Sequence, residues 1–114
     1  MESILIATKK LLGMDENYKA FDVDVIIQIN MTIAILTQMG VGPSEGFVIE
    51  NEYATYEDFI PEAPILQGLV KDYIYLKTRL VFDPPTISSV LAAMERSITE
   101  LEWRISVQVD PSNK

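Results

Sequence analysis

YIYLKTRLVFDPPTISSVLAAMERSITELEWR, residues 73–104, is the stretch of sequence that decides the fold. Asp83-Pro84-Pro85 divides it, because proline disfavours the helical conformation in the residue before it and cannot donate to the helical hydrogen-bond ladder. On both sides of this break the apolar residues recur at spacings of three and four, as on one face of a helix. Those positions are Leu66, Leu69, Tyr73, Leu76 and Leu80 before it, and Ile87, Leu91, Met94, Ile98, Leu101 and Ile105 after it. We therefore expect helices over about 64–82 and from about 86 to 103 or 105, joined by a rigid corner.

Two more helices are expected before this stretch. Helical spacing covers residues 3–12 and 23–39, and Gly13 and Gly40 follow as stop signals. The second run is rich in β-branched residues, but it is far longer than an ordinary strand. Its apolar stripe is wide, so this helix is expected to be buried on more than one side. Asp22 or Asp24 is expected to cap it, and Thr86 or Ser88 the last helix.

The remaining segments are expected to be irregular. In residues 41–63, Phe47 to Ile49 fits either a strand or a buried loop, and Thr55 begins one helical turn through Phe59. Beyond residue 104, Ile105, Val107 and Val109 alternate with polar residues, which is the period of a strand. The prediction is therefore an all-α fold, a small bundle of about four main helices. It comprises one helical domain over 1–104 and an extended C-terminal tail over 105–114, frayed at 111–114.

Composition excludes most kinds of chemistry. The 114 residues include no cysteine and no histidine, so thiolate nucleophiles, a Ser-His-Asp triad and the usual structural zinc sites are ruled out. The close carboxylate pairs lie one or two positions apart and diverge on a helix, and no glycine-rich phosphate loop is present. We expect no enzymatic activity, no cofactor and no metal.

The net charge of the chain restricts the kinds of partner that it is expected to bind. The net charge of −8 disfavours binding to nucleic acid or to an anionic membrane surface. No apolar run is long enough to cross a bilayer, and Glu2 stands where a secretory signal would carry basic residues. The expected location is therefore the cytoplasm.

Contacts with a partner are expected at the second half of the quoted stretch and beyond it. Tyr73 fits the core, whereas Tyr75 lies off the apolar stripe and suits solvent or a partner equally well. Trp103 either folds back onto the body or lies at an interface, where Trp is over-represented. The alternating tail suits addition to a neighbouring chain. The 41–63 segment and the tail have no obvious place in a four-helix core. The candidate contact residues are Tyr75, Phe82, Asp83, Pro84, Pro85, Trp103, Ile105, Val107 and Val109.

The sequence resembles a known family. The run from Tyr73 to Pro85, and the helix Met94-Glu95-Arg96-Ser97-Ile98-Thr99-Glu100-Leu101-Glu102-Trp103-Arg104, are similar to the signature of phage head–tail connector proteins, the head-completion or adaptor proteins of long-tailed phages and prophages. Residues 36–43, Gly46-Phe47 and the opening 9–13 also fit this family. The resemblance covers nearly the whole chain.

The resemblance implies a structural role without catalytic residues. Such subunits form a ring of about twelve copies below the portal protein, at the head–tail junction of a virion assembled in the host cytoplasm. The ring extends the DNA channel and docks the next head-completion or tail protein. DNA passes through without sequence-specific binding. If carboxylates line the bore of the ring, DNA meets no surface to which it binds. A bore lined mainly by Lys and Arg would contradict this hypothesis.

An alternative function is a cytoplasmic acidic helical module that binds or regulates a basic partner without catalysis. Acidity and small size fit this function equally well, but the 73–104 stretch does not.

Overall fold

The structure is a computed structural model that describes residues 2–110, and this range contains five helices and no strand. They are α1 (Ile4–Leu11), α2 (Asp22–Gln38), α3 (Tyr56–Phe59), α4 (Pro64–Phe82) and α5 (Ser88–Val109). The expected all-α bundle is confirmed. Four helices are long and α3 is a single turn, which matches the helical turn expected after Thr55.

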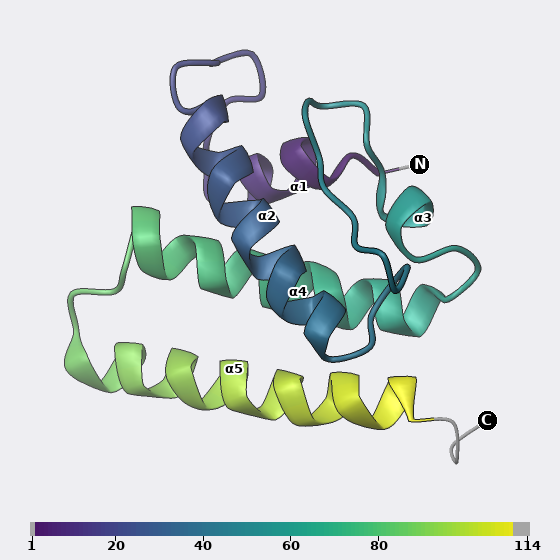
Figure 1. Ribbon diagram of the computed structural model, residues 1–114. Coiled ribbons are helices and arrows are strands. Elements are labelled where there is room, and N and C mark those ends of the chain that lie inside the picture. The colour runs from purple at the N-terminus through teal and green to yellow at the C-terminus, as the bar shows by residue number, and fades with distance from the viewer. Residues whose placement is uncertain (1, 111–114) are drawn as a thin grey trace.

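Helix α4 lies at the centre of the fold. Each of the other four helices packs against it, and α1 also packs against α2 (Figure 1). In the view of Figure 1, α5 runs below α4, α1 and α3 lie above it, and α2 crosses in front of it. The buried core along α4 is formed by Val70, Tyr73 and Ile74. The two longest helices therefore form a hairpin against which the first half of the chain packs.

The corner at Asp83-Pro84-Pro85 ends α4 at the expected residue. Pro64 opens the helix in its first turn, where a missing N–H costs nothing, and Asp83 follows its last residue. Across the hairpin, the Tyr73 hydroxyl donates a 2.8 Å hydrogen bond to the Glu102 carboxylate. The Tyr73 ring is fully buried, as predicted. This bond fixes how α5 lies along α4.

The expected extended tail is wrong for residues 105–109, which form the last turns of α5. Ile105 is fully buried in the core, and Val109, four residues later, packs against the same core. Positions four apart share a helix face, so this pair continues the apolar seam of α5. An alternation over five residues cannot distinguish a strand from the end of a long helix. The proposed boundary at 104/105 falls inside α5, and residues 111–114 lie outside the described part.

The 41–63 segment is irregular, as expected, but it belongs to the core. Ile49 is buried, and the Asn30 side chain on α2 holds its backbone. The Asn30 amide nitrogen donates to the Ile49 carbonyl at 2.9 Å, and the Ile49 N–H donates to the Asn30 side-chain oxygen at 2.8 Å. The Phe47 and Phe59 rings stack with centroids 4.9 Å apart. The idea that this segment has no place in the core is therefore wrong, and Phe47 to Ile49 is a partly buried loop rather than a strand.

Two of the expected helix caps are also wrong. Phe21 occupies the N-cap of α2 and Ile87 that of α5, and neither provides a side-chain hydrogen bond. Asp22 lies inside α2, where its carboxylate forms a 2.7 Å ion pair with the Lys9 ammonium. A tertiary charge contact thus replaces the local cap.

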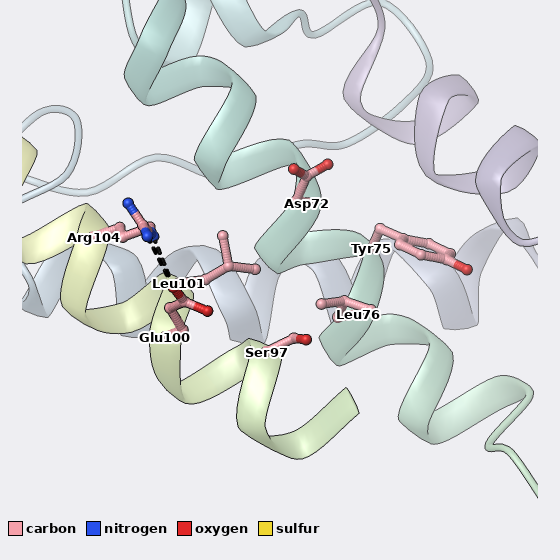
Figure 2. A pocket seen from close by; sticks show the side chains of 7 residues that line it. All are labelled: Asp72, Tyr75, Leu76, Ser97, Glu100, Leu101 and Arg104. Atoms are coloured by element: carbon pink, nitrogen blue, oxygen red, sulfur yellow. Dashed lines mark hydrogen bonds and ion pairs between the residues drawn. The ribbon is translucent and has the colours of Figure 1, made fainter. Parts of the chain in front are cut away.

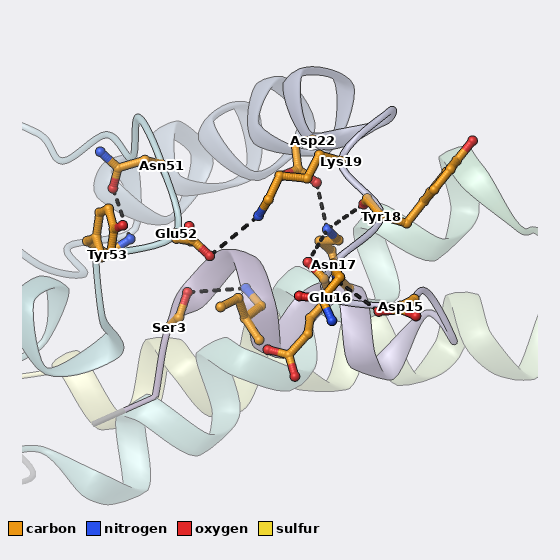
Figure 3. A network of polar contacts seen from close by, with 12 residues as sticks. Ser3, Asp15, Glu16, Asn17, Tyr18, Lys19, Asp22, Asn51, Glu52 and Tyr53 are labelled. Atoms are coloured by element: carbon orange, nitrogen blue, oxygen red, sulfur yellow. Dashed lines mark hydrogen bonds and ion pairs between the residues drawn. The ribbon is translucent and has the colours of Figure 1, made fainter.

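Lys9 is the most unusual residue of the core, because its side chain is only 2% exposed. Its ammonium donates to the carbonyl oxygens of Glu16 and Tyr18, at 3.1 and 2.7 Å, in addition to pairing with Asp22. Figure 3 shows this network in the loop between α1 and α2. Three acceptors satisfy the three donors of the ammonium group. The buried charge therefore ties α1 to the loop and to the start of α2.

We predict that Lys9→Met destabilises the chain by about 3 kcal/mol, because it leaves the Asp22 carboxylate and two carbonyl oxygens without their donor. The exposed neighbour provides the control, and Lys10→Met should change the free energy of unfolding by less than about 0.5 kcal/mol. Urea unfolding followed by circular dichroism measures both. Equal stability of the two variants would show that the ammonium is not a structural tie.

A second prediction concerns Gly42, which has a φ of +74° and lies against the Phe59 ring. An added Cβ would overlap ring atoms, so Gly42→Ala should cost about 3 kcal/mol from backbone strain and overpacking together. Gly46 has a φ of +99° but open space around it. Gly46→Ala should therefore cost only about 1 kcal/mol. Thermal unfolding of both variants separates the two contributions, and a Gly42→Ala loss no larger than that of Gly46→Ala would contradict the packing part.

Candidate assembly interface

The corner between α4 and α5 is exposed at its tip. Asp83 and Pro84 are exposed and Pro85 is half-buried, while Phe82 packs against the core. The Arg79 guanidinium donates to the Asp83 carbonyl at 3.2 Å. The corner is therefore a rigid projection, and Phe82 belongs more to the core than to the surface.

A surface groove of about 340 Å³ lies between α4 and α5. Figure 2 shows the residues that line it, Asp72, Tyr75, Leu76, Ser97, Glu100, Leu101 and Arg104. Arg104 donates two hydrogen bonds to Glu100, at 3.1 and 2.9 Å, as the spacing of four predicts. The Tyr75 hydroxyl accepts a 3.2 Å hydrogen bond from Arg79. Glu100, Arg104 and Tyr75 thus already have partners within the subunit.

Trp103 lies on the outer surface of α5 with 64% of its side chain exposed. The Arg104 guanidinium lies 5.9 Å from the centroid of its ring. Of the tail candidates, Ile105 is fully buried and therefore not accessible to a partner. Val107 and Val109 are half-buried, and Val109 packs beside Gly40 at the end of α2. The geometry singles out Trp103 as the exposed aromatic side chain of α5.

One apolar surface was missed among the candidate contact residues. It lies on the outer side of α2, where four side chains spaced four residues apart are each between 37% and 69% exposed. We call Val23, Ile27, Met31 and Ile35 the α2 stripe. Asp24 is the only charged residue from 23 to 38. A helix that is apolar all round is typically buried on both sides. That pattern was visible in the sequence, but it does not reveal which side the core uses.

Charge is divided unevenly along the chain. Residues 20–70 contain eight of the 17 acidic residues and no Lys or Arg. The other nine acidic residues are balanced by all nine basic ones, so this segment accounts for the whole net charge of −8. In space it comprises α2, the 41–63 loop, α3 and the first turns of α4 (Figure 1). This segment is therefore strongly acidic. Within residues 2–110 the basic residues come before it, at Lys9, Lys10 and Lys19, or after it, on the rest of α4 and on α5.

Two buried tyrosines have raised pKa values. Burial raises the pKa of Tyr56. Burial also raises the pKa of Tyr73, and its bond to the Glu102 carboxylate raises it further. Within residues 2–110 no cluster of acidic side chains has the arrangement of a metal site. In the same range no helix is long and apolar enough to cross a membrane.

Together, these features describe a helical protein with exposed apolar and aromatic side chains on α2 and α5. The model of the phage connector protein family matches residues 4–112. The chain belongs to this family of phage structural proteins, and the head–tail connector resemblance seen in the sequence is confirmed. Comparisons with curated proteins and with solved structures found no match.

The Tyr73 bond leads to a prediction about alkaline stability. The ordinary pKa of tyrosine is 10.0, and the folded chain raises it. The stability that this shift contributes is therefore fully present below about pH 10 and is lost as the pH rises toward the folded pKa. Tyr73→Phe should lose about 2 kcal/mol at neutral pH, because Glu102 loses its donor, and should then fall less steeply with pH than the wild type. Urea unfolding across alkaline pH measures both slopes. Parallel curves would contradict the assignment.

Proposed function

We propose that this chain is the repeating subunit of a ring of about twelve copies, attached below the portal protein at the head–tail junction of a phage or prophage particle. The ring extends the DNA channel and presents a docking surface to the next head-completion or tail protein. Its assembly takes place in the host cytoplasm. The observation that carries this proposal is the family match, which covers all five helices.

The surface geometry supports a ring. A closed ring of identical subunits uses heterologous contacts, which need two different surfaces on each subunit. The α2 stripe and Trp103 are exposed on two different helices, and both helices pack against α4. The protein thus has material for two contacts that do not overlap.

The charge supports passage of DNA without sequence-specific binding. Each subunit has a net charge of −8, so a ring of such subunits repels phosphate on average. Part of the basic charge is also neutralised within the subunit, since Lys9 pairs with Asp22, and Lys71 and Arg104 form ion pairs with Glu2 and Glu100. The subunit itself is proposed to catalyse nothing, since the chain lacks Cys and His.

The decisive experiment uses portal particles of the same phage. We expect the purified chain to cosediment with them and to appear in negative-stain images as an added ring on one side. Portal-free samples and an unrelated protein of similar charge are the controls. Absence of binding to portal particles would overturn the proposal, even if the chain forms rings alone. The acidic binding module would then remain as the alternative. Binding of the chain to a basic partner protein instead of the portal would support that alternative.

A further inference from the structure

The α2 stripe is an exposed ridge that the subunit itself leaves uncovered. Its side chains expose 69% at Val23, 53% at Ile27, 59% at Met31 and 37% at Ile35. Residues four apart form one of the ridges by which helices pack into grooves. Val48, in the neighbouring loop, is 65% exposed and lies on a surface hollow shared with Ala34. Scattered exposed apolar side chains are common, but a contiguous uncharged ridge marks a contact surface.

The outer face of α5 has complementary properties. Ala92, Arg96, Thr99 and Trp103 follow one another at spacings of four, three and four, so they share one side of the helix. The first three line a shallow hollow together with Glu95. Trp and Arg are the residues most enriched where binding energy concentrates. This face, which we call the Trp103 face, thus combines a hollow, an aromatic anchor and a basic side chain.

Charge distinguishes between the two surfaces of a second copy that the α2 stripe could contact. The stripe belongs to the 20–70 segment, which holds the whole net charge of −8. A two-fold contact of α2 with α2 would bring two such acidic segments together, and like charges at close quarters are costly. A head-to-tail contact instead places the acidic segment of one subunit against α5, whose Arg96 and Arg104 nearly balance Glu95, Glu100 and Glu102, so the like-charge repulsion is much smaller. Charge therefore favours the heterologous arrangement over the isologous one.

We infer that the α2 stripe of one subunit packs onto the Trp103 face of the next copy of the same chain. The occupant of the stripe is thus a second copy, and the ridge of Ile27 and Met31 enters the hollow beside Trp103. This inference rests on the proposed ring, and it assigns the two surfaces from which the ring is built. The tip at Asp83-Pro84 and the α4–α5 groove are left for other partners.

Cross-linking tests the arrangement without background, because the chain has no cysteine. Ala34 and Thr99 are both exposed, and each lies on one of the two surfaces without being an anchor. We expect Ala34→Cys and Thr99→Cys chains, mixed on portal particles, to be joined by a short bis-maleimide, while neither variant is joined to itself. Lys10→Cys, exposed on α1, replaces either partner as the control and should give no product.

The outcomes separate this inference from the proposed function. Cross-linking of Ala34→Cys to itself overturns the inference in favour of a two-fold contact. Rings or portal-bound subunits that give no product from the mixture overturn it while leaving the proposed function standing. Failure to bind portal particles at all overturns both.

A second measurement uses surface variants that should fold normally. Ile27→Glu places a charge on the ridge and Trp103→Ala removes the anchor, and both side chains are largely exposed in the single subunit. We expect each to weaken ring formation on portal particles by about tenfold or more, with an unchanged circular dichroism spectrum. Lys10→Met, away from both surfaces, should assemble like the wild type. Normal assembly of Ile27→Glu and Trp103→Ala would overturn the inference.

Discussion

The rest of this structure depends on the burial of α4 by all four other helices. Helix α5 runs along it, α1 and α3 pack against it as well, and α2 crosses it. Tyr73 sits at the middle of this arrangement with a buried ring and a hydroxyl bonded to Glu102 on α5. Because one central helix meets every other helix, its length and its end at Asp83 set the positions of all of them. A change that shortened α4 would therefore displace both outer surfaces together.

The first half of the chain has too few helices to cover α4 with helices alone. Buried polar contacts hold the remaining segments in place. Lys9 joins α1 to the following loop and to Asp22, while Asn30 fastens the backbone of Ile49 to α2. Both contacts satisfy buried polar groups, which would otherwise be costly. They hold α2 at an orientation in which Val25 and Ile29 face the core and the α2 stripe faces outward. The α2 stripe is thus exposed because these buried contacts fix the orientation of α2.

A connector needs rigidity in the subunit and specificity at its surfaces. The buried polar contacts of Lys9 and Asn30, together with the proline corner, provide rigidity, because few groups can move without losing a hydrogen bond or a packed contact. The absence of basic residues from 20–70 provides a basis for specificity, since it makes this segment electrostatically different from the rest of the chain. The same acidity disfavours DNA binding. One feature of composition therefore bears both on contacts between proteins and on contacts with DNA.

The sequence by itself determined the helices with long, uniform periods and clear stops. Residues 64–82 were located without error because Pro64 and Asp83-Pro84-Pro85 act through local sterics, and the family was evident from the same stretch. The sequence also excluded His- and Cys-based chemistry outright. Only the tertiary structure decided the helical state of 105–109, because burial of Ile105 overrides a short alternation. It likewise decided that Lys9 is buried and that the α2 stripe is exposed. Those outcomes depend on which neighbours α1 and α2 meet, and a one-dimensional pattern does not contain that information.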